Sequence, residues 1–408
     1  MKTAAIIAEF NPLHNGHVYL IEQAREAGAD HVLVVMSGNF VQRGEPAVFD
    51  KYVRAEAAVR CGADAVFSIP ARFSTASAER YADANIRALI GLNCVDFLIF
   101  GSESGNLKTI DQCAKVLAEE PEDYRIKLRD GLKRGLSFPK ARAEALPEFA
   151  EILREPNNIL AVEYLKSMRR RHAGFEALTV RRKGASYHEK LIGEDFGQDG
   201  SGICASASAI RELIKNSGTD NAEFRNTVPS EAADLFRRAA EKRMAAEDFS
   251  AILAAALFSS DEADHFTEFE DVTDELARRI LAGRNHFSGV QSFSEQLASK
   301  SLTESHAMRA LMHIALGLKK DVPYRDESVT ELLALRKDAE PLLKRICSQS
   351  SIPVVIRKKA DLRNMSENEA MLFSEEMRIS NLYGMLEAMK SGMPFVNEYE
   401  RGVVKVKA

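Results

Sequence analysis

The stretch AEFNPLHNGH, residues 8–17, follows directly on an apolar run that predicts a buried strand from Thr3 to Ala8. Pro12 predicts a tight turn after that strand, and Gly16 has no side chain to keep a ligand away from the backbone. A helix is predicted to begin at His17, and the free amides of a helix's first turn attract anions. The stretch therefore predicts an anion site at the end of the first strand.

The first hundred residues alternate apolar runs with stretches of helical periodicity. The predicted strands are Thr3 to Ala8, His31 to Met36, Ala65 to Ile69 and Val95 to Phe100, and the segments His17 to Ala27 and Asp50 to Cys61 are predicted helices. This βαβ order predicts a parallel, doubly wound sheet that binds its ligand at the carboxyl ends of its strands.

The chain is mostly helical in pattern from Asn106 to about Arg170, and ALTVRRKG (177–184) predicts one more strand. Turn residues in NSGTDN (216–221) suggest a boundary between a first domain, 1–217, and a second, 218–408. The second domain has mainly helical patterns, with two short candidate strands in IPVVIRK (352–358) and in the tail RGVVKVKA (401–408). The predicted fold class is α/β, with a Rossmann-like doubly wound parallel sheet followed by a mainly α-helical C-terminal domain.

The composition is that of an ordinary globular chain, with 408 residues, 45% hydrophobic and 28% charged. No run approaches the roughly 18 apolar residues that a membrane span needs, and no signal peptide is expected, so a cytoplasmic protein is predicted. The net charge of −5 gives no overall attraction to nucleic acid. Cysteine is odd in number and never spaced as CxxC, so neither disulfides nor a structural zinc are expected. The cysteines are Cys61, Cys94, Cys113, Cys204 and Cys347.

His14 and His17 lie three residues apart at the predicted mouth of the sheet. Two imidazoles there can donate hydrogen bonds to the oxygens of a phosphate chain, and their charge can rise as negative charge develops in a transition state. The alternative is that they are ordinary histidines at a helix start. Their place directly after the first strand favours the functional interpretation.

The motif FNPLHNGH (10–17) resembles the HxGH signature of the nucleotidyltransferase and class I aminoacyl-tRNA synthetase superfamily, whose members cleave ATP between the α- and β-phosphates. SASAIR (206–211) resembles that superfamily's downstream phosphate-binding segment, with a serine where the usual pattern has threonine. Ser206 or Ser208 suits a helix N-cap, and Arg211 would complement phosphate charge. A capping motif without a ligand is the alternative.

Three further stretches, SGNFVQRGEPA (37–47), FGSESG (100–105) and REPNNILAVEYLK (154–166), extend the similarity. With the two motifs above, residues 1–214 resemble the bacterial tRNA(Met) cytidine acetate ligase family. The resemblance implies a HIGH-type nucleotidyltransferase fold. It also implies that ATP activates acetate as acetyl-adenylate, and that the acetyl group passes to the wobble cytidine of elongator tRNA(Met) as N4-acetylcytidine. Mg²⁺ is expected on the outer phosphates.

The expected catalytic residues are His14 and His17. The expected ATP-binding residues are Ile7, Ala8, Glu9, Phe10, Asn11, Pro12, Leu13, Asn15, Gly16, Gly101, Asn157, Asn158, Arg182, Ser206, Ser208 and Arg211. Gly101 is predicted to follow its strand, and the resemblance makes it the adenine end. Asn157 and Asn158 either cap a helix or bind ribose or phosphate. Of the neighbours Arg181 and Arg182, only one is expected to enter the site, and Arg182 is favoured.

Positive charge gathers in KSMRRRHAGFEALTVRRKG (166–184). The expected tRNA-binding residues are Lys166, Arg169, Arg170, Arg171 and Lys183. The alternative is a merely solvated charged surface. The second domain is expected to assist tRNA binding, or else only to cover the sheet, and a chain that ends near Gly218 is expected to bind ATP if it folds.

Two other functions remain open from the sequence. The chain could be a nucleotidyltransferase that adenylylates a small phosphorylated metabolite, or a nucleotide-binding regulatory module without turnover. Cys204, beside the second motif, is expected to be a small buried residue and not a nucleophile. The sequence does not indicate the oligomeric state, the acetate pocket or the residues that contact the anticodon.

Overall fold

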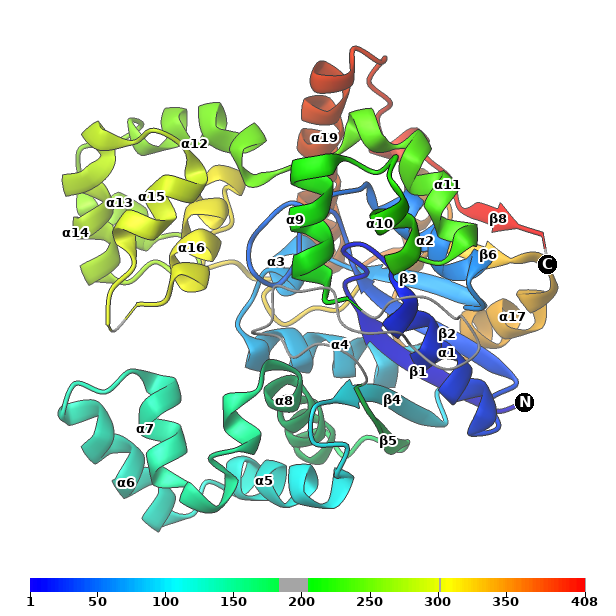
Figure 1. Cartoon of the computed structure of the whole chain (residues 1–408), viewed down its shortest axis with the longest axis horizontal. Coiled ribbons are helices and arrows are strands. Elements are labelled where there is room, and N and C mark those ends of the chain that lie inside the picture. Colours follow the sequence, from blue (N-terminus) through cyan, green and yellow to red (C-terminus); the bar gives the residue numbers. More distant parts are fainter. Residues whose placement is uncertain (183–204, 301, 408) are drawn as a thin grey trace.

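The computed structural model describes residues 1–182, 205–300 and 302–407. Within these residues, eight strands form one sheet with the order β5-β4-β1-β2-β3-β6-β7, and β8 pairs with β6 (Figure 1). The strands are β1 Thr3–Ala8, β2 His31–Ser37, β3 Ala65–Ile69, β4 Phe97–Ser102, β5 Glu176–Arg181, β6 Thr330–Arg336, β7 Val354–Val355 and β8 Val404–Val406. Strands β1 to β5 are parallel to one another, so the predicted doubly wound parallel sheet is confirmed.

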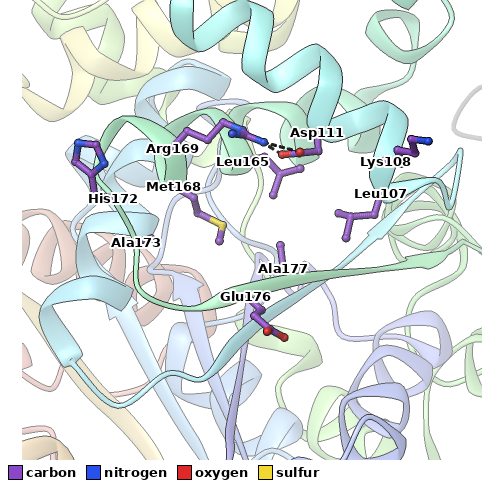
Figure 2. Close-up of a pocket in the computed structure, with 10 residues that line it drawn as sticks. All are labelled: Leu107, Lys108, Asp111, Leu165, Met168, Arg169, His172, Ala173, Glu176 and Ala177. Carbon is purple, nitrogen blue, oxygen red and sulfur yellow. Dashed lines mark hydrogen bonds and ion pairs between the residues drawn. The ribbon is translucent and has the colours of Figure 1, made fainter.

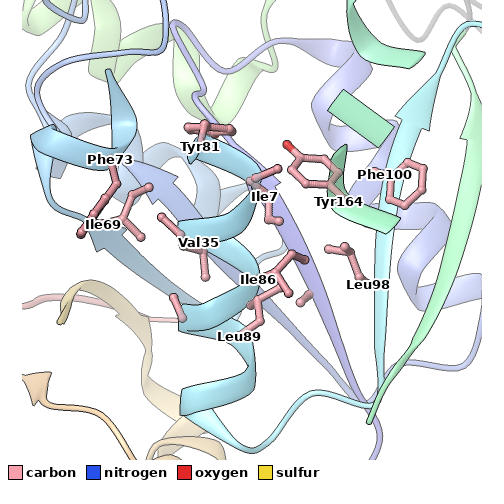
Figure 3. Close-up of a cluster of buried hydrophobic side chains, with 14 of the residues drawn as sticks. Ile7, Val35, Ile69, Phe73, Tyr81, Ile86, Leu89, Leu98, Phe100 and Tyr164 are labelled. Atoms are coloured by element: carbon pink, nitrogen blue, oxygen red, sulfur yellow. The ribbon is translucent and has the colours of Figure 1, made fainter. Parts of the chain in front are cut away.

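Helices cover both faces of the sheet. One face packs against α4, α5 and α8, and Ile7, Val35 and Leu98 are buried in its core (Figure 3). The opposite face packs against α1, α2, α9, α10 and α11. These helices are α1 Asn15–Glu26, α2 Lys51–Arg60, α4 Ala78–Leu92, α5 Leu107–Glu119, α8 Pro156–Arg170, α9 Ala207–Ser217, α10 Ala222–Thr227 and α11 Ser230–Arg238. With apolar cores on both sides, the sheet presents its polar groups at its ends.

Two predicted boundaries near the site were wrong. Helix α1 begins at Asn15 and not at His17, because the His14 side chain caps it. Strand β4 runs to Ser102, so Gly101 lies within the strand and does not follow it. Its pairing with β5 continues through Ser102 opposite Arg181, which keeps the backbone extended there.

Strand β6 was not predicted. Its sequence TELLALR is rich in leucine and alanine, which favour helices, yet six of its seven residues are buried. It runs antiparallel to β3, and the predicted strands at 352–358 and 401–408 pair with it as β7 and β8. The C-terminal part of the chain therefore completes the sheet that was predicted from the first domain, so the second domain is not separate from it.

The rest of the described chain is helical. Helices α12 to α16 form a lobe to one side of the sheet, with its own apolar core around Phe249, Leu253 and Phe293 (Figure 1). The lobe helices are α12 Ser250–Leu257, α13 Ala263–Thr267, α14 Asp274–Gly283, α15 Val290–Leu297 and α16 Glu304–Leu316. The others are α3 Ala71–Ser74, α6 Glu122–Lys133, α7 Phe138–Ala145, α17 Glu340–Gln349, α18 Lys358–Asp361 and α19 Glu367–Ser391. Among the described residues, no helix combines the length and the apolar character that a membrane crossing needs.

A buried ionic network joins the two ends of the chain. Lys51, at the start of α2, is fully buried and lies 2.8 Å from carboxylate oxygens of Glu331 on β6 and of Glu398 near the C-terminus. Tyr52 donates a hydrogen bond within the same group, and Lys358 pairs with the same two carboxylates. A buried cation is costly without its partners, so α2 depends on residues that lie far along the chain.

Candidate active site

His14 and His17 cap helix α1 together. The Nδ1 atom of His14 accepts a hydrogen bond from the amide of Gly16 at 3.1 Å, and the Nδ1 atom of His17 accepts one from the amide of His14 at 3.2 Å. This is a capping box in which imidazoles take the places of the usual serine and glutamate. The two rings lie stacked, with their centroids 3.7 Å apart.

The capping bonds decide which ring nitrogen carries the proton. A neutral imidazole that accepts at Nδ1 has its proton on Nε2, so each histidine keeps one N–H donor for a ligand. Burial, and then the nearby Arg182 and Arg211, lower the pKa of His14 to about 3. Burial and the neighbouring His14 also hold the pKa of His17 well below its usual range. The histidines are therefore neutral donors in the chain without a ligand. That they gain charge as negative charge develops beside them in the transition state stays a prediction.

The carboxyl ends of β1 and β2 are held by Arg54, which the sequence analysis missed. Its side chain is fully buried on α2, and its Nη1 donates to the main-chain oxygens of Glu9 at 2.6 Å and Ser37 at 3.2 Å. Its Nε donates to the main-chain oxygen of Phe49 at 2.8 Å. The sequence signal was an arginine among the small apolar residues of a predicted helix. Arg54 fixes the turn that leads to the histidines.

The second motif lies against the first. Ser206 caps α9, its hydroxyl accepting a hydrogen bond from the amide of Ala209, so the predicted capping role is confirmed. Arg211 lies one turn further, and its Nη1 donates to the main-chain oxygen of Asn11 at 3.0 Å. Ser208 is half-buried at the start of the same helix. Two segments far apart in the sequence thus meet at the end of β1.

Arg182 lies just beyond β5 and also approaches the histidines. A Cβ atom on Gly101 would lie 3.2 Å from Cγ of Arg182, so the glycine accommodates the arginine stem. Arg181 instead lies over Gly105, where a Cβ atom added to the glycine would lie 2.7 Å from Cβ of Arg181. The two arginines take different faces of the strand end, and Arg182 is the one whose charge reaches His14 and His17.

Asn157 and Asn158 begin helix α8, but Glu103 provides the cap. Its carboxylate accepts hydrogen bonds from the amide of Asn158 at 2.8 Å and from the side chain of Asn157 at 2.6 Å. The Asn158 side chain, almost fully buried, accepts from the amide of Ser104. Asn157 is half-buried, and its side-chain oxygen lies 3.5 Å from Nη1 of Arg182. Asn158 therefore shapes the turn after β4, and Asn157 remains the one of the pair that faces the candidate site.

The other expected ATP-binding residues differ in exposure. Ile7, Phe10 and Leu13 have side chains in the hydrophobic cores, so only their backbone could meet a ligand. Ala8, Asn11 and Pro12 are also buried, whereas Glu9, Asn15 and Gly16 are half-buried. Phe10 has a positive φ of 47°, a backbone conformation that is uncommon for a residue with a side chain. Such conformations gather at functional turns.

The predicted basic segment carries less net charge than its sequence suggests. Arg169 pairs with Asp111 at 2.5 Å, Arg171 with Asp83 at 2.5 Å, and Arg170 with Glu120 at 2.9 Å. Lys166 pairs with Glu79 at 2.8 Å. The expectation of concentrated positive charge overlooked these carboxylates, which come from helices α4 and α5 and the end of α5. Lys183 lies outside the described residues, as does Cys204.

A cavity of about 870 Å³ lies between α5 and α8, close to the amino end of β5 (Figure 2). Its lining includes Leu107, Met168, His172 and the paired Arg169 and Asp111. Because the histidines lie at the carboxyl ends of the strands, this cavity is at the opposite end of the sheet from them. Arg169 and Asp111 in its lining form an ion pair with each other, and the cavity contains none of the residues of the two motifs.

Metal ligands are not grouped in the described part of the chain. No cluster of three or more histidine, cysteine, aspartate or glutamate side chains there could hold a metal ion. Cys61, Cys94, Cys113 and Cys347 are free thiols. A nucleotide site of this kind can still use Mg²⁺ that is held mainly by phosphate oxygens and water.

Comparison with known proteins connects this geometry with a family. The family model described as HIGH Nucleotidyl Transferase matches residues 1–394. A tRNA(Met) cytidine acetate ligase from Acetivibrio thermocellus is 32% identical over 403 residues, covering 94% of this chain and 95% of the relative. One from Thermoanaerobacter sp. is 31% identical over 411 residues, covering 97% and 99%. The chain belongs to the tRNA(Met) cytidine acetate ligase family.

The resemblance stated from the motifs in residues 1–214 is thereby confirmed, and it extends over most of the chain. Solved structures share the fold of this chain. Thermotoga maritima TmcAL bound with alpha-thio ATP superposes with a TM-score of 0.88 at 24% identity, and its apo form with 0.89 at 25%. Each comparison covers 100% of both chains. The helical part of this chain beyond residue 217 is thus included in the match with the Thermotoga maritima structures.

Proposed function

We propose that this chain uses ATP to activate acetate as acetyl-adenylate and then acetylates the wobble cytidine of elongator tRNA(Met). The observation that carries the proposal is the meeting of His14, His17 and Arg211 at the end of β1. Relatives that cover nearly the whole chain have the name tRNA(Met) cytidine acetate ligase, and a structural neighbour binds an ATP analogue.

The chemistry explains why such a site needs donors. Acetate is a stable anion, and it must attack the α-phosphate of another anion. Each neutral histidine keeps a proton on Nε2, and these two N–H groups can donate hydrogen bonds to phosphate oxygens. Arg211 and Arg182, both close to His14, can offset the growing negative charge. No side chain needs to form a covalent intermediate.

In the proposed ATP site, the triphosphate lies across the turn from Phe10 to Gly16 and reaches the start of α9. Ser206, Ser208 and Arg211 would meet its outer phosphates, where Mg²⁺ would also bind. The adenosine would lie toward β4 and β5, near Gly101, Asn157 and Arg182. Asn158 is not proposed to bind ATP, because its side chain already accepts a hydrogen bond in the turn after β4. Glu9 is removed from this site, since a carboxylate would repel the phosphates.

The tRNA backbone is proposed to bind at the carboxyl end of α8. The basic residues there are Lys166, Arg169, Arg170 and Arg171. Phosphates would have to displace the carboxylate partners of these side chains to bind. Lys183 follows in sequence. The helical lobe and the C-terminal helices of residues 218–408 are proposed to hold the anticodon arm while the acetyl-adenylate is kept from water.

Exchange of labelled pyrophosphate into ATP tests the proposal. We expect exchange that depends on acetate, followed by acetylation of tRNA(Met) transcripts. Exchange that requires a phosphorylated metabolite would favour the alternative nucleotidyltransferase. No exchange with acetate or with any such metabolite would favour a regulatory nucleotide-binding protein.

A further inference from the structure

We propose that Glu9 is the proton acceptor of the acetyl-transfer step, its second carboxylate oxygen taking a proton from the exocyclic amine of the incoming cytosine. The inference deepens the proposed function and rests on it. It assigns a catalytic residue to the second half-reaction, for which His14, His17 and Arg211 provide no base.

The geometry holds Glu9 at the mouth of the sheet. It follows β1 directly, and its side chain belongs to the face of β1 that carries Ile7. Arg54 fixes its main-chain oxygen at 2.6 Å, and its side-chain Oε1 accepts the amide of Gln42 at 2.9 Å. Among the described residues, Oε2 has no hydrogen-bond partner, and the residue is only half-buried. One oxygen is therefore anchored, and the other is available to a substrate.

Charged and titratable groups approach Glu9 from every element packed around it. They are Arg211 on α9, Arg43 and Glu45 in the loop after β2, Arg54 on α2, Tyr81 on α4 and Tyr164 on α8. Figure 3 shows Tyr81 and Tyr164 beside Ile7, with the Tyr164 hydroxyl directed toward Tyr81. Burial raises the pKa of Glu9, although the amide of Gln42 and the charges of Arg211 and Arg43 oppose the rise. A raised pKa makes the carboxylate a better proton acceptor near neutral pH.

The position also separates Glu9 from the phosphate donors. His14 and His17 lie beyond the turn, at the start of α1, and Glu9 lies before it, beside the loop that follows β2. A nucleophile adds to one face of the planar acetyl carbonyl, and its base must lie on the same side as the attacking nitrogen. For an amine that enters over β1 and β2, Glu9 would lie on that side, and the amide of Gln42 holds its carboxylate in place.

The transfer step balances with a single base. The amine nitrogen forms a bond with the acetyl carbon, and the bond from that carbon to the phosphate oxygen breaks, so that AMP leaves with the electron pair. The amine must lose one proton, because its conjugated nitrogen would otherwise carry a positive charge. Glu9 accepts that proton and later releases it to water, and no other reactant is required.

Glu9→Gln is the decisive variant, because a glutamine oxygen can still accept the Gln42 amide but cannot take a proton. We expect acetate-dependent pyrophosphate exchange within about threefold of the wild type. We expect single-turnover transfer from preformed acetyl-adenylate to tRNA(Met) to fall by about a hundredfold or more, as is typical of losing a general base. Wild-type transfer should rise with pH through the titration of Glu9, and the variant should lose this rise.

Glu45→Gln is the matched control, since it removes a nearby negative charge that raises the pKa of Glu9. Glu45→Gln should still transfer the acetyl group to tRNA(Met), and the rise of its transfer rate with pH should occur at lower pH than in the wild type. Equal losses of exchange and transfer in Glu9→Gln would overturn the inference and place Glu9 in the adenylation step. Unchanged transfer would overturn it as well. If the wild type shows no acetate-dependent exchange, the proposed function and this inference both fail, which distinguishes that result from a failure of Glu9 alone.

Discussion

Arg211 donates a hydrogen bond to the main-chain oxygen of Asn11 at 3.0 Å, across 200 residues of sequence. The bond connects the start of α9 to the turn that carries the histidines. It leaves Arg211 anchored beside the place where negative charge is expected to develop. A guanidinium has further N–H groups for a phosphate, whereas an ammonium would have to divide three donors between both tasks.

Replacing Arg211 with alanine should raise the KM for ATP and slow acetate-dependent pyrophosphate exchange by at least about tenfold, because a cation is lost beside the phosphates. Arg211→Lys should recover only part of the rate. Lys215→Ala, on the exposed part of the same helix, is the matched control. Exchange that stays at the wild-type rate in Arg211→Ala would remove Arg211 from the proposed site.

His14→Ala and His17→Ala should each slow acetate-dependent exchange by about a hundredfold or more, since each removes a preorganised donor. His14→Asn preserves a helix-capping group, so its exchange should fall while its helix is retained. Circular dichroism separates loss of the donor from loss of the fold. A folded alanine variant with a normal exchange rate would contradict the assigned roles.

The buried His14 should make the protein sensitive to mild acid. Its pKa is lowered to about 3 in the folded chain, so between that pH and about 6.5 the unfolded chain binds more protons. Stability is thus complete above pH 6.5 and falls as the pH drops toward 3. Between pH 7 and pH 5, His14→Asn should lose roughly 2 kcal/mol less of its unfolding free energy than the wild type. Urea unfolding at both pH values measures this, with the exposed His286→Asn as control. An equal loss in wild type and His14→Asn would contradict it.

The basic helix end offers a paired test of tRNA contact. If phosphates displace the carboxylates, replacing Arg169, Arg170 and Arg171 with glutamine should weaken tRNA binding and flatten its salt dependence, while exchange is spared. Asp83→Asn and Asp111→Asn should do the opposite and strengthen binding, because they release Arg171 and Arg169. Filter binding at several salt concentrations measures both. If affinity is the same in all of these variants, the tRNA binds elsewhere.

A chain that ends at Gly218 should fail to fold, which revises the expectation from sequence. It would lack β6, so the edge of β3 would be uncovered, and Lys51 would be buried without Glu331 and Glu398. A chain that ends at Arg401 loses only β8 and keeps the pair between Arg401 and Asp50, so it should fold. Circular dichroism and ATP binding compare the two. A shorter chain that folds and binds ATP would show that residues 1–218 form an independent domain.

Local patterns were sufficient to predict the centre of the molecule. Strands β1 and β3 have the predicted bounds, and β2 differs by one residue at its end, because buried parallel strands read as short apolar runs between turns. The histidine pair, Arg211 and the choice of Arg182 followed from spacing and from resemblance. The structure brings these groups together, and their roles in catalysis remain to be tested.

What the sequence by itself determined was the place of the first strands along the chain and the turn that carries His14 and His17, because these depend on residues close together in the chain. Only the tertiary structure decided that TELLALR is a strand, since its helix-forming residues gain more by burial beside β3. It also decided that Glu103 caps α8 and that Asp83 and Asp111 neutralise the basic helix end. Long-range hydrogen bonds and ion pairs form between segments whose meeting depends on the whole fold, and no local periodicity records them.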